Sequence, residues 1–488
     1  MSHEIDRRAM LRLSAATGAG VLAAPLLAAR ASAAGSASAA RAASAGLNSP
    51  GRGASAAGGA AGQAADRAAD RIVRSVRRPR FPDRFFPITS FGAVGDGTTD
   101  CTGAFRDAIA ACSRRGGHVI VPAGTFFTGA IHLLSNVDLH LEQGSVILFS
   151  QDPNAYLPVV FTRWQGVELM NYSPPVYSYG QHNIAITGQG TLNGQADANH
   201  WWNWKSLETA DFNALTAMAD ANVPVAQRVF GDGHFLPPQM IQPFLSENVL
   251  ISGVTVVNSP FWHLNPNLCR NVTVEGITVN SSGPNTDGCD PESCDGVVID
   301  GCTFSCGDDC IAIKSGRDSD GRRVGVPSAN LVIQNCTFAS GHGGITLGSE
   351  MTGGVRNVYG RDLAMNSPIL QSGHRIKTNT LRGGYVINSN VYRVTAATIG
   401  GPVLKIEGQY NGQTGNFPPD VTGITLADWT VGSCQGVWSL VGASATDPVG
   451  TVTLSDIAVT TSTAANSSEF VANLVIDDVT VGGVAVTP

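Results

Sequence analysis

Short alternating runs of apolar and polar residues recur along most of this chain. One run occupies residues 248–256 (Asn-Val-Leu-Ile-Ser-Gly-Val-Thr-Val), and a similar run begins 23 residues later at Asn271. Each run predicts two short strands separated by a turn, with alternate side chains on one face. Further copies begin at Gly296 and Asn330, and weaker ones at Asn183, Asn357, Gly423, Thr451 and Asn473.

A single run is too small to bury its own apolar face, so the copies must pack on one another. The four best copies begin at intervals of 23 to 34 residues, which is typical of a parallel β-helix. A β-sandwich also contains many short strands, but it does not need the same pattern at the same phase. We therefore predict an all-β fold built as a parallel β-helix.

A solenoid needs its ends covered. Residues 102–112 place Phe105, Ile109 and Cys112 at helical spacing just before the first strands. We therefore predict an amphipathic N-terminal helix that caps the first coil.

The first residues have the features of an export signal. Arg7 and Arg8 are followed by an apolar stretch at 15–29, which is too short for a membrane-spanning helix of ~20 residues. Small residues at 31–33 (Ala-Ser-Ala) suit a cleavage site. The pattern resembles the twin-arginine signal. We interpret 1–33 as a leader and expect a secreted protein, extracellular or periplasmic.

The rest of the chain divides at a change in composition. Residues 34–80 are rich in Ala, Gly, Ser and Arg, which predicts a disordered linker. The Ala-Ala-Asp-Arg repeat at 64–71 leaves a short helix as an alternative. The repeats define a β-helix domain over 81–488, and we interpret the almost 50 residues at 195–243 that interrupt them as an insertion.

Composition and charge exclude several classes of protein. The chain has 57 glycines among 488 residues but no Gly-X-Y period, which excludes collagen. With 14% charged and 43% hydrophobic residues, it is not mainly disordered. Residues 1–80 hold 12 arginines and 4 acidic residues, whereas 81–488 holds 19 basic and 34 acidic residues. The acidic domain argues against a nucleic-acid partner, and we expect no membrane partner.

Ten cysteines are present, and five of them lie between residues 289 and 310. Their spacing lacks the paired Cys-x-x-Cys pattern that is typical of a zinc site. We therefore predict buried thiols or disulfides rather than a metal site.

Four polar motifs follow successive repeats at similar places. They are Asn-Thr-Asp-Gly at 285–288, Gly-Asp-Asp at 307–309, Gly-His-Gly at 341–343 and Arg-Ile-Lys at 375–377. Asp308 and His342 each lie 12 residues after the start of their repeat. Because stacked coils rise by about 4.8 Å, the motifs should form one stripe on one face. Its expected members are Asn285, Asp287, Asp308, Asp309, His342, Arg375 and Lys377.

The residue types on this stripe suit the hydrolysis of a glycosidic bond in an acidic sugar. Crowded carboxylates repel, so at least one should keep its proton to higher pH. A protonated acid beside an ionised base is what glycoside hydrolysis needs. Arginine and lysine together can hold a carboxylate on the substrate. Each motif alone is usually structural, but four motifs in phase on adjacent coils favour a shared site.

With these motifs, the chain resembles the polygalacturonase family of glycoside hydrolases, family 28. The segment 335–349 (Asn-Cys-Thr-Phe-Ala-Ser-Gly-His-Gly-Gly-Ile-Thr-Leu-Gly-Ser) is similar to the family's signature around its histidine, and the other three motifs match in order. The resemblance extends from about Ile88 to about Tyr410. It implies a right-handed parallel β-helix and inverting hydrolysis of α-1,4-linked galacturonate in pectin, closest to the exo-acting bacterial branch.

The resemblance also implies a role for each site residue. Asp308 would be the general acid, Asp287 and Asp309 would hold and deprotonate the water, and His342 would tune the acid. The residues expected to contact or orient the substrate are Arg375, Lys377, Asn285 and Tyr410. The sequence gives no sign of a metal or organic cofactor. We expect a monomer that acts on polygalacturonate or pectin oligosaccharides.

Several points stay open within the family. The insertion favours exo action, as does the segment 285–294, but endo action and a rhamnogalacturonan substrate fit the same motifs. Relatives often read Trp-x-x-His-Pro where this chain has Trp-His-Leu-Asn-Pro at 262–266, which would alter subsite preference if His263 contacts sugar. The cluster of Trp201, Trp202 and Trp204 either stacks on sugar or packs the insertion onto the solenoid.

Two other classes compete with hydrolysis. A pectate lyase would share the fold and the substrate but would use calcium and an Arg or Lys base. A non-catalytic carbohydrate-binding β-helix would have no reason to place three aspartates on one stripe.

Overall fold

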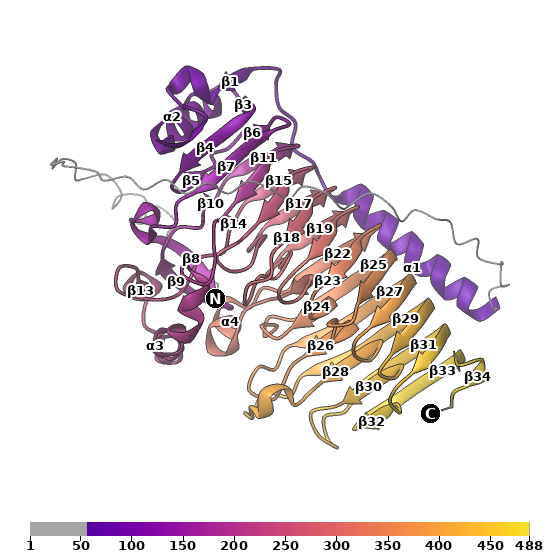
Figure 1. Ribbon diagram of the computed structural model, residues 1–488. Coiled ribbons are helices and arrows are strands. Elements are labelled where there is room, and N and C mark those ends of the chain that lie inside the picture. The colour runs from indigo at the N-terminus through magenta and orange to yellow at the C-terminus, as the bar shows by residue number, and fades with distance from the viewer. Residues whose placement is uncertain (1–55, 488) are drawn as a thin grey trace. The chain divides into compact units, whose positions relative to one another are not determined.

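Figure 1 shows the computed structural model of the protein. The structure describes residues 56–487, which lie in one compact unit. The predicted leader at 1–33 and the part of the predicted linker before residue 56 lie outside the described residues.

Three rows of stacked strands wind through this unit as a parallel β-helix (Figure 1), which confirms the predicted fold. The first row contains β1 (Phe85–Pro87), β3 (Gly117–Val121), β6 (Val137–Leu141), β11 (His182–Gly188), β15 (Glu247–Ser252), β17 (Arg270–Glu275), β19 (Asp295–Asp300), β22 (Ser328–Gln334), β25 (Val355–Ser367), β27 (Tyr385–Ile399), β29 (Asp420–Cys434), β31 (Val449–Ser462) and β33 (Val471–Val481).

The second row merges with the first from β25 onward, because β25 pairs with both β22 and β23. Its strands are β2 (Asp96–Asp100), β4 (Gly124–Thr128), β7 (Ser145–Phe149), β12 (Thr191–Asn193), β16 (Thr255–Val257), β18 (Thr278–Asn280), β20 (Thr303–Ser305) and β23 (Thr337–Ser340).

The third row contains or directly follows the polar motifs predicted from sequence. Its strands are β5 (Ile131–His132), β10 (Val176–Tyr179), β14 (Ile241–Phe244), β21 (Ile311–Ile313), β24 (Gly343–Gly348), β26 (Ser372–Lys377), β28 (Leu404–Glu407), β30 (Trp438–Val441) and β32 (Ser467–Glu469). Between β14 and β21, two coils contribute only isolated bridges, at 264–267 and 289–292.

An asparagine ladder explains why the repeats begin with asparagine. Asn271 Nδ2 donates to Asn248 Oδ1 at 3.0 Å, and Asn248 Nδ2 donates to Asn183 Oδ1 at 2.9 Å. These residues have φ between 51° and 56°, a left-handed conformation that asparagine tolerates better than most residues. The same contact joins Asn357 to Asn330 and Asn388 to Asn357 at 3.0 and 2.9 Å.

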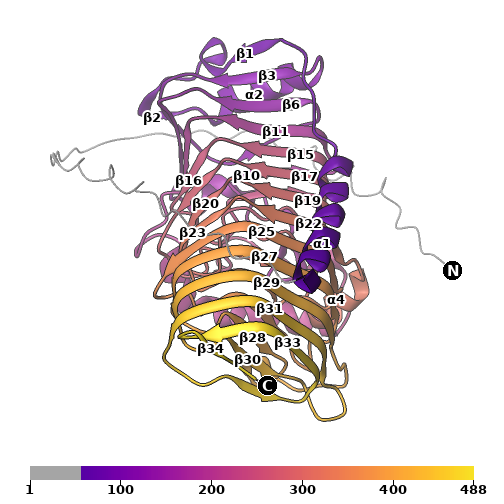
Figure 2. The same ribbon diagram turned by 90° about the vertical axis from the view of Figure 1, so that its right-hand side faces the viewer.

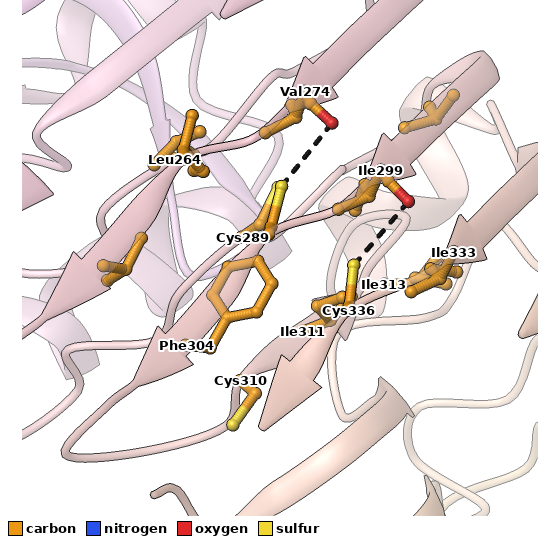
Figure 3. Close-up of a cluster of buried hydrophobic side chains, with 14 of the residues drawn as sticks. Leu264, Val274, Cys289, Ile299, Phe304, Cys310, Ile311, Ile313, Ile333 and Cys336 are labelled. Atoms are coloured by element: carbon orange, nitrogen blue, oxygen red, sulfur yellow. Dashed lines mark hydrogen bonds between the residues drawn. The ribbon is translucent and has the colours of Figure 1, made fainter. Parts of the chain in front are cut away.

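The interior of the solenoid is filled by stacked apolar side chains and thiols (Figure 3). Phe304 stacks on Phe338 of the next coil with ring centroids 5.9 Å apart. All ten cysteines are buried free thiols, as one of the two predicted alternatives requires, and no disulfide is formed among them. Cys336 Sγ, for example, lies 3.8 Å from the carbonyl oxygen of Ile299 (Figure 3).

The N-terminal end of the solenoid is covered by a helix, whereas most of the last long strand, β33, is exposed or half-buried. Helix α2 (Thr102–Ser113) buries Phe105, Ile109 and Cys112 against the first coils, which confirms the predicted cap. At the other end, β34 (Val484–Ala485) pairs antiparallel with β33.

Helix α1 (Ala56–Ser75) lies along the outside of the first row (Figure 2). Asp66 and Asp70 pair with Arg361 at 3.0 and 2.8 Å, and Asp66 pairs with Arg393 at 2.9 Å. The expected linker disorder therefore does not hold for this stretch, because distant strands supply charged and apolar partners that composition alone does not reveal. Within the described residues, no helix combines the length and apolar character needed to cross a membrane.

An elaboration stands beside the third row (Figure 1). It consists of the hairpin β8 (Val160–Trp164) and β9 (Val167–Asn171), strand β13 (Val229–Phe230), and helices α3 (Glu208–Asp220) and α4 (Asp318–Val324). It is larger than the insertion predicted from sequence, since the hairpin precedes that segment. The 3-10 helices are η2 (Ile88–Phe91), η3 (Pro153–Tyr156), η4 (Trp202–Ser206), η5 (Val225–Gln227) and η6 (Tyr410–Gly412).

Candidate active site

Residues from four successive coils meet where each coil enters the third row. Asp308 and Asp309 lie between β20 and β21, and Thr346 of β24 is in register with Arg375 of β26. The structure brings together the predicted members Asn285, Asp287, Asp308, Asp309, His342, Arg375 and Lys377. Their proximity was predicted from repeat phase alone, and their catalytic roles stay predictions.

Three carboxylates form the centre of the site. One oxygen from each of Asp287, Asp308 and Asp309 lies within 4.8 Å of the others. Lys377 Nζ donates to Asp309 Oδ2 at 2.7 Å, and His342 Nδ1 lies 3.3 Å from Asp308 Oδ1. Asp309 therefore has an ammonium partner and Asp308 an imidazole partner.

Asn285 connects the acids to the insertion. Its Nδ2 lies 3.5 Å from Asp308 Oδ2, and its Oδ1 accepts a hydrogen bond from Lys205 Nζ at 2.7 Å. Lys205 also donates to Glu208 Oε1 at 2.7 Å. Lys205 was not predicted from sequence, because an insertion has no repeat phase that would place it beside the acids.

Arg375 lies on β26, one coil after His342, and so on the side of the acids that faces the C-terminus. Its Nε donates to Glu407 Oε2 at 2.7 Å, and its Nη1 donates to Gln371 Oε1 at 2.9 Å. The ring of Tyr410 lies 6.0 Å from Arg375 Cζ and 5.7 Å from Lys377 Nζ, measured to the ring centroid. Tyr410 is therefore beside the predicted carboxylate-binding pair.

A fourth acid, Asp290, lies buried beneath Asp287. Lys314 Nζ lies 3.6 Å from Asp290 Oδ2 and 3.9 Å from Asp287 Oδ2. Burial raises the pKa of Asp287 well above its usual range, and the charges of Asp290 and Asp308 add to this effect. Burial also raises the pKa of Asp290 to about 8, although Lys314 opposes it. Burial therefore favours the protonated forms of Asp287 and Asp290, whereas the charge of Lys314 favours their ionised forms.

The pair of Asp308 and His342 behaves in the opposite way. Burial acts to raise the pKa of Asp308, but the hydrogen bond from His342 and the charge of Lys377 outweigh it, so this pKa is lowered. The same hydrogen bond raises the pKa of His342. The pair therefore exists as imidazolium and carboxylate over a wider pH range than isolated side chains would.

Lys314 is held in a buried network that sequence patterns did not reveal. Its ammonium lies 4.3 Å from the ring centroid of Trp262 and donates to Glu350 Oε2 at 3.2 Å. Glu350 Oε1 in turn accepts from Arg317 Nη1 at 3.3 Å and lies 3.8 Å from Arg382 Nη1. Breaking such a network would leave uncompensated charge in a buried place.

The elaboration covers the outer face of the third row on one side of the acids. Alternation places Gln242, Asn267 and Glu292 on that outer face, yet all three are fully buried. Arg163 of β8 donates to Glu292 Oε1 at 2.9 Å, and Thr162 donates to Gln242. Asn267 Nδ2 donates to Glu292 Oε2 at 2.8 Å. The elaboration therefore covers the third row on this side of the acids, which we call the insertion side.

His263 is not exposed to a substrate. It is fully buried, its Nδ1 lies 2.8 Å from the carbonyl oxygen of Asp287, and its Nε2 lies 2.8 Å from Ser281 Oγ. Burial lowers its pKa to about 4. A neutral His263 therefore donates to the backbone of Asp287 and helps to hold that residue in place.

The tryptophan cluster packs the insertion onto the solenoid. Trp201 and Trp204 are buried, and Trp201 meets the edge of Tyr156 with ring centroids 5.4 Å apart. Trp202 is half-buried, and its Nε1 donates to the carbonyl oxygen of Ser259 at 2.9 Å. Of the two interpretations, packing is the one that these contacts support.

Comparison with known proteins supports the family that the sequence motifs resemble. The family model for glycosyl hydrolases family 28 matches residues 231–479. A probable polygalacturonase of Vitis vinifera is 35% identical over 327 residues, which cover 64% of this chain and 60% of that protein. An exopolygalacturonase of Zea mays is 29% identical over 274 residues, covering 55% of each chain. The chain thus spans less than two thirds of the length of these relatives.

Among solved structures, a hyperthermoactive exopolygalacturonase from Thermotoga maritima superposes with a TM-score of 0.81 and 39% identity, covering 85% of this chain and 96% of that chain. A family 28 exopolygalacturonase of Yersinia enterocolitica shares the fold, with a TM-score of 0.66 and 21% identity over 83% of this chain and 80% of that chain. The family model and the likeness to the Thermotoga maritima enzyme show that the chain belongs to glycosyl hydrolases family 28.

Proposed function

We propose that this chain hydrolyses α-1,4-galacturonosidic bonds of polygalacturonate and releases the terminal sugar from one end of the polymer. The observation that carries this proposal is the group of three carboxylates, with Arg375 and Lys377 beside them. An arginine and a lysine can hold the carboxylate of a galacturonate next to the bond that is cleaved. The relatives named polygalacturonase and exopolygalacturonase support the same substrate.

The proton for the leaving oxygen would come from the pair of His342 and Asp308. In the free site, the electrostatics favour an imidazolium beside an ionised Asp308. An anionic sugar bound next to Asp308 makes its ionised form less favourable. The proton then passes from His342 Nδ1 to Asp308 Oδ1 and from Asp308 to the leaving oxygen, so Asp308 remains the residue that protonates the bond.

The attacking water would be activated by Asp309 and oriented by Asp287. Lys377 Nζ lies 2.7 Å from Asp309 Oδ2, so this carboxylate has a cationic partner, whereas the pKa of Asp287 is raised well above its usual range. In most inverting enzymes the general acid and the general base lie ~6.5–9.5 Å apart. Here the nearest oxygens of Asp308 and Asp309 are closer than that. Inversion is therefore inferred from the family and is tested by following the anomer of the first product by NMR.

Exo action is supported by the closed insertion side. Residues that would line an extended groove there, such as Glu292, are instead bonded to Arg163 of the hairpin. A polymer could extend from the acids only toward Arg375 and the later coils. The terminal sugar would then occupy the space between the insertion and Asp308.

Purified protein incubated with polygalacturonate tests the reaction class. We expect new reducing ends, no absorbance of unsaturated sugars, and no effect of a chelator. Asp308→Asn should lower the rate by at least about a hundredfold, because a positioned acid contributes 10²–10⁴-fold. A circular dichroism spectrum identical to that of the unaltered protein is the control for folding.

Two outcomes would contradict the proposal. Unsaturated products together with loss of activity in a chelator would identify a calcium-dependent lyase. Full activity of the Asp308→Asn variant would show that the acid has been assigned wrongly.

We also propose that the chain is exported by its N-terminal leader. The twin-arginine pattern at Arg7 and Arg8 supports this. Replacement of both arginines by lysine should retain the protein in the cytoplasm, which cell fractionation measures.

A further inference from the structure

Exposed arginines form a row on the flank of the solenoid, outside the candidate active site. Helix α1 lies along the first row of strands (Figure 2), whereas the acids lie where the coils enter the third row. The row continues from α1 into the segment that connects α1 to β1. Its seven members, which we call the arginine row, are Arg67, Arg71, Arg74, Arg77, Arg78, Arg80 and Arg84.

Helix α1 presents its arginines outward because the solenoid holds its other face. Ala69 is fully buried against the first row. Asp66 and Asp70 pair with Arg361 at 3.0 and 2.8 Å, which fixes the rotation of the helix. Positions three and four apart lie on one face of a helix, so the three arginines of α1 form a line away from the solenoid.

Most of the arginine row has no acidic partner. Among the described residues, Arg78 pairs with Glu275, and no ion pair involves the three arginines of α1. Two acids lie along the same stretch of chain, namely Asp70, which is paired with the solenoid, and Asp83. The row is therefore a positive stripe whose guanidinium groups are available to an external anion.

An exposed aromatic ring lies at the end of the arginine row. Phe85 directly follows Arg84 and is 62% exposed. Its ring stacks on His118 with centroids 5.5 Å apart, and Phe81 meets the edge of the same imidazole at 5.7 Å. A guanidinium binds a carboxylate at two points, and an aromatic face offers apolar area for the C–H face of a sugar. Together these groups suit an acidic polysaccharide.

The same surface is poorly suited to a lipid membrane. A helix that lies on a membrane directs its large apolar side chains into the lipid. In α1 the large apolar side chains, Ile72 and Val73, are half-buried and pack toward the first row. The outward face of the helix thus offers charge without an apolar anchor.

From these observations we propose that the arginine row is a second binding site for a long galacturonan chain, separate from the active site. Its guanidinium groups receive carboxylates along the polymer, and Phe85 packs on one of its sugars. The identity of the polymer rests on the proposed function. Residues 81–488 hold 34 acidic and 19 basic residues and so repel such a polymer at long range. The row offsets this repulsion and keeps the polymer near the active site.

Binding of polygalacturonate to the Asp308→Asn variant tests this proposal without cleavage. Adding the triple substitution Arg67→Gln/Arg71→Gln/Arg74→Gln should weaken binding about tenfold at low salt, since each exposed guanidinium contributes a modest share of the attraction. Glutamine retains a high helix propensity, so α1 should persist. The difference should shrink at high salt, because salt screens exposed charges. Surface plasmon resonance on immobilised polygalacturonate measures the affinity.

The matched control removes the same charge elsewhere. It carries Arg106→Gln, Arg270→Gln and Arg356→Gln, three exposed positions on α2, β17 and β25 that lie outside the arginine row. Its affinity should stay within about twofold of the parent. Equal weakening in both triple variants would show that net charge alone matters and would overturn the proposal. Unchanged affinity in a row variant with an intact thermal unfolding transition would also overturn it.

Other polyanions test the choice of ligand. Double-stranded DNA and phosphatidylserine vesicles are measured on the same variants. Binding of either that is tighter than that of polygalacturonate, and is lost in the row variant, would assign the row to that partner and contradict the galacturonan site.

Kinetics separate this inference from the proposed reaction. In otherwise unaltered protein, the row variant should cleave trigalacturonate at the normal rate but show a raised KM for polygalacturonate at low salt. A loss of equal size on both substrates would contradict a separate site. If the unaltered protein cleaves no galacturonan, the proposed function fails, and the binding measurements still decide the role of the row.

Discussion

The two sides of the candidate site are built from the same repeat but end in different environments. On the insertion side, outward-facing third-row residues such as Gln242 and Glu292 are fully buried beneath the β8–β9 hairpin. On the other side, equivalent positions carry Arg375, Lys405 and Ser439, and the last two line an open groove. The two sides differ in exposure because the elaboration covers the third row on one side and leaves it uncovered on the other.

This comparison separates chemistry from the mode of action. The repeating coils bring Asp287, Asp308, Asp309 and His342 together, as their phase requires. The elaboration, which has no repeat pattern, decides how far a polymer can extend on one side. Changes in the elaboration should therefore alter the products, whereas changes in the coils should alter the rate.

The largest effect is expected on the closed side, at Lys314. Lys314→Met would leave Asp287, Asp290 and Glu350 without their shared cation, and removing one partner of a buried ion pair costs about 3–5 kcal/mol. Urea unfolding should show a loss of this size, together with strongly reduced activity. Arg356→Met, at an exposed position on the first row, is the control and should change little. A Lys314→Met variant as stable as the unaltered protein would contradict the role of the network.

The next largest effect is expected on the open side, at Arg375. Arg375→Ala should lower kcat/KM on polygalacturonate about thirtyfold to a hundred-and-fiftyfold, since a charged hydrogen bond to a carboxylate is worth about 2–3 kcal/mol. Arg375→Lys should recover only part of this loss, because lysine cannot make a two-point contact. Steady-state kinetics measure both variants. Full activity of Arg375→Ala would show that Arg375 does not bind the substrate carboxylate.

A smaller effect is expected from His342, where the two sides meet. The pKa of His342 is raised above the ordinary 6.5. His342 is therefore protonated below pH 6.5 and loses its proton as the pH rises through the raised pKa. The pKa of Asp308 is lowered below the ordinary 3.8, so its carboxylate is ionised above that value and protonates only at lower pH. Activity should therefore fall on the alkaline side as His342 loses its proton.

The variant His342→Gln should lose this alkaline limb and about tenfold in rate at neutral pH. A pH profile of kcat/KM measures both. An alkaline limb that persists unchanged in the variant would show that another group supplies the proton.

The smallest effect is expected at Lys205, the contact of the insertion with Asn285. Lys205→Met removes the hydrogen bond to Asn285 together with the ion pair to Glu208, and loss of the Asn285 contact, worth about 1 kcal/mol, should lower the rate about fivefold. Lys405→Met, on the open side, offers a comparison in which the loss should grow with substrate length. A length-dependent loss for Lys205 instead would mean that the insertion side is open to polymer.

Much of the solenoid could be predicted from sequence because its contacts repeat. Asn248 and Asn271 occupy the same place in adjacent coils, so their contact is visible as a period in the chain. The phase of Asp308 and His342 predicted their proximity in the same way.

The features that were not predicted depend on partners without such a period. Helix α1 is held by Arg361 and Arg393, far along the chain, which composition could not indicate. Lys314 directly follows a short strand, where the sequence pattern gives no sign of burial. It is buried because the elaboration covers this part of the third row. Asp290 could have been found from its outward position three residues after Asp287.

The products formed early from polygalacturonate test the comparison of the two sides most directly. Because the insertion side is closed, free galacturonate should be the sole product at low conversion, and the viscosity of the polymer should fall slowly. Chromatography of the first per cent of cleavage would show this. A ladder of oligomers at that stage, with a rapid fall in viscosity, would show that the polymer extends past the acids on the insertion side and would contradict its closure.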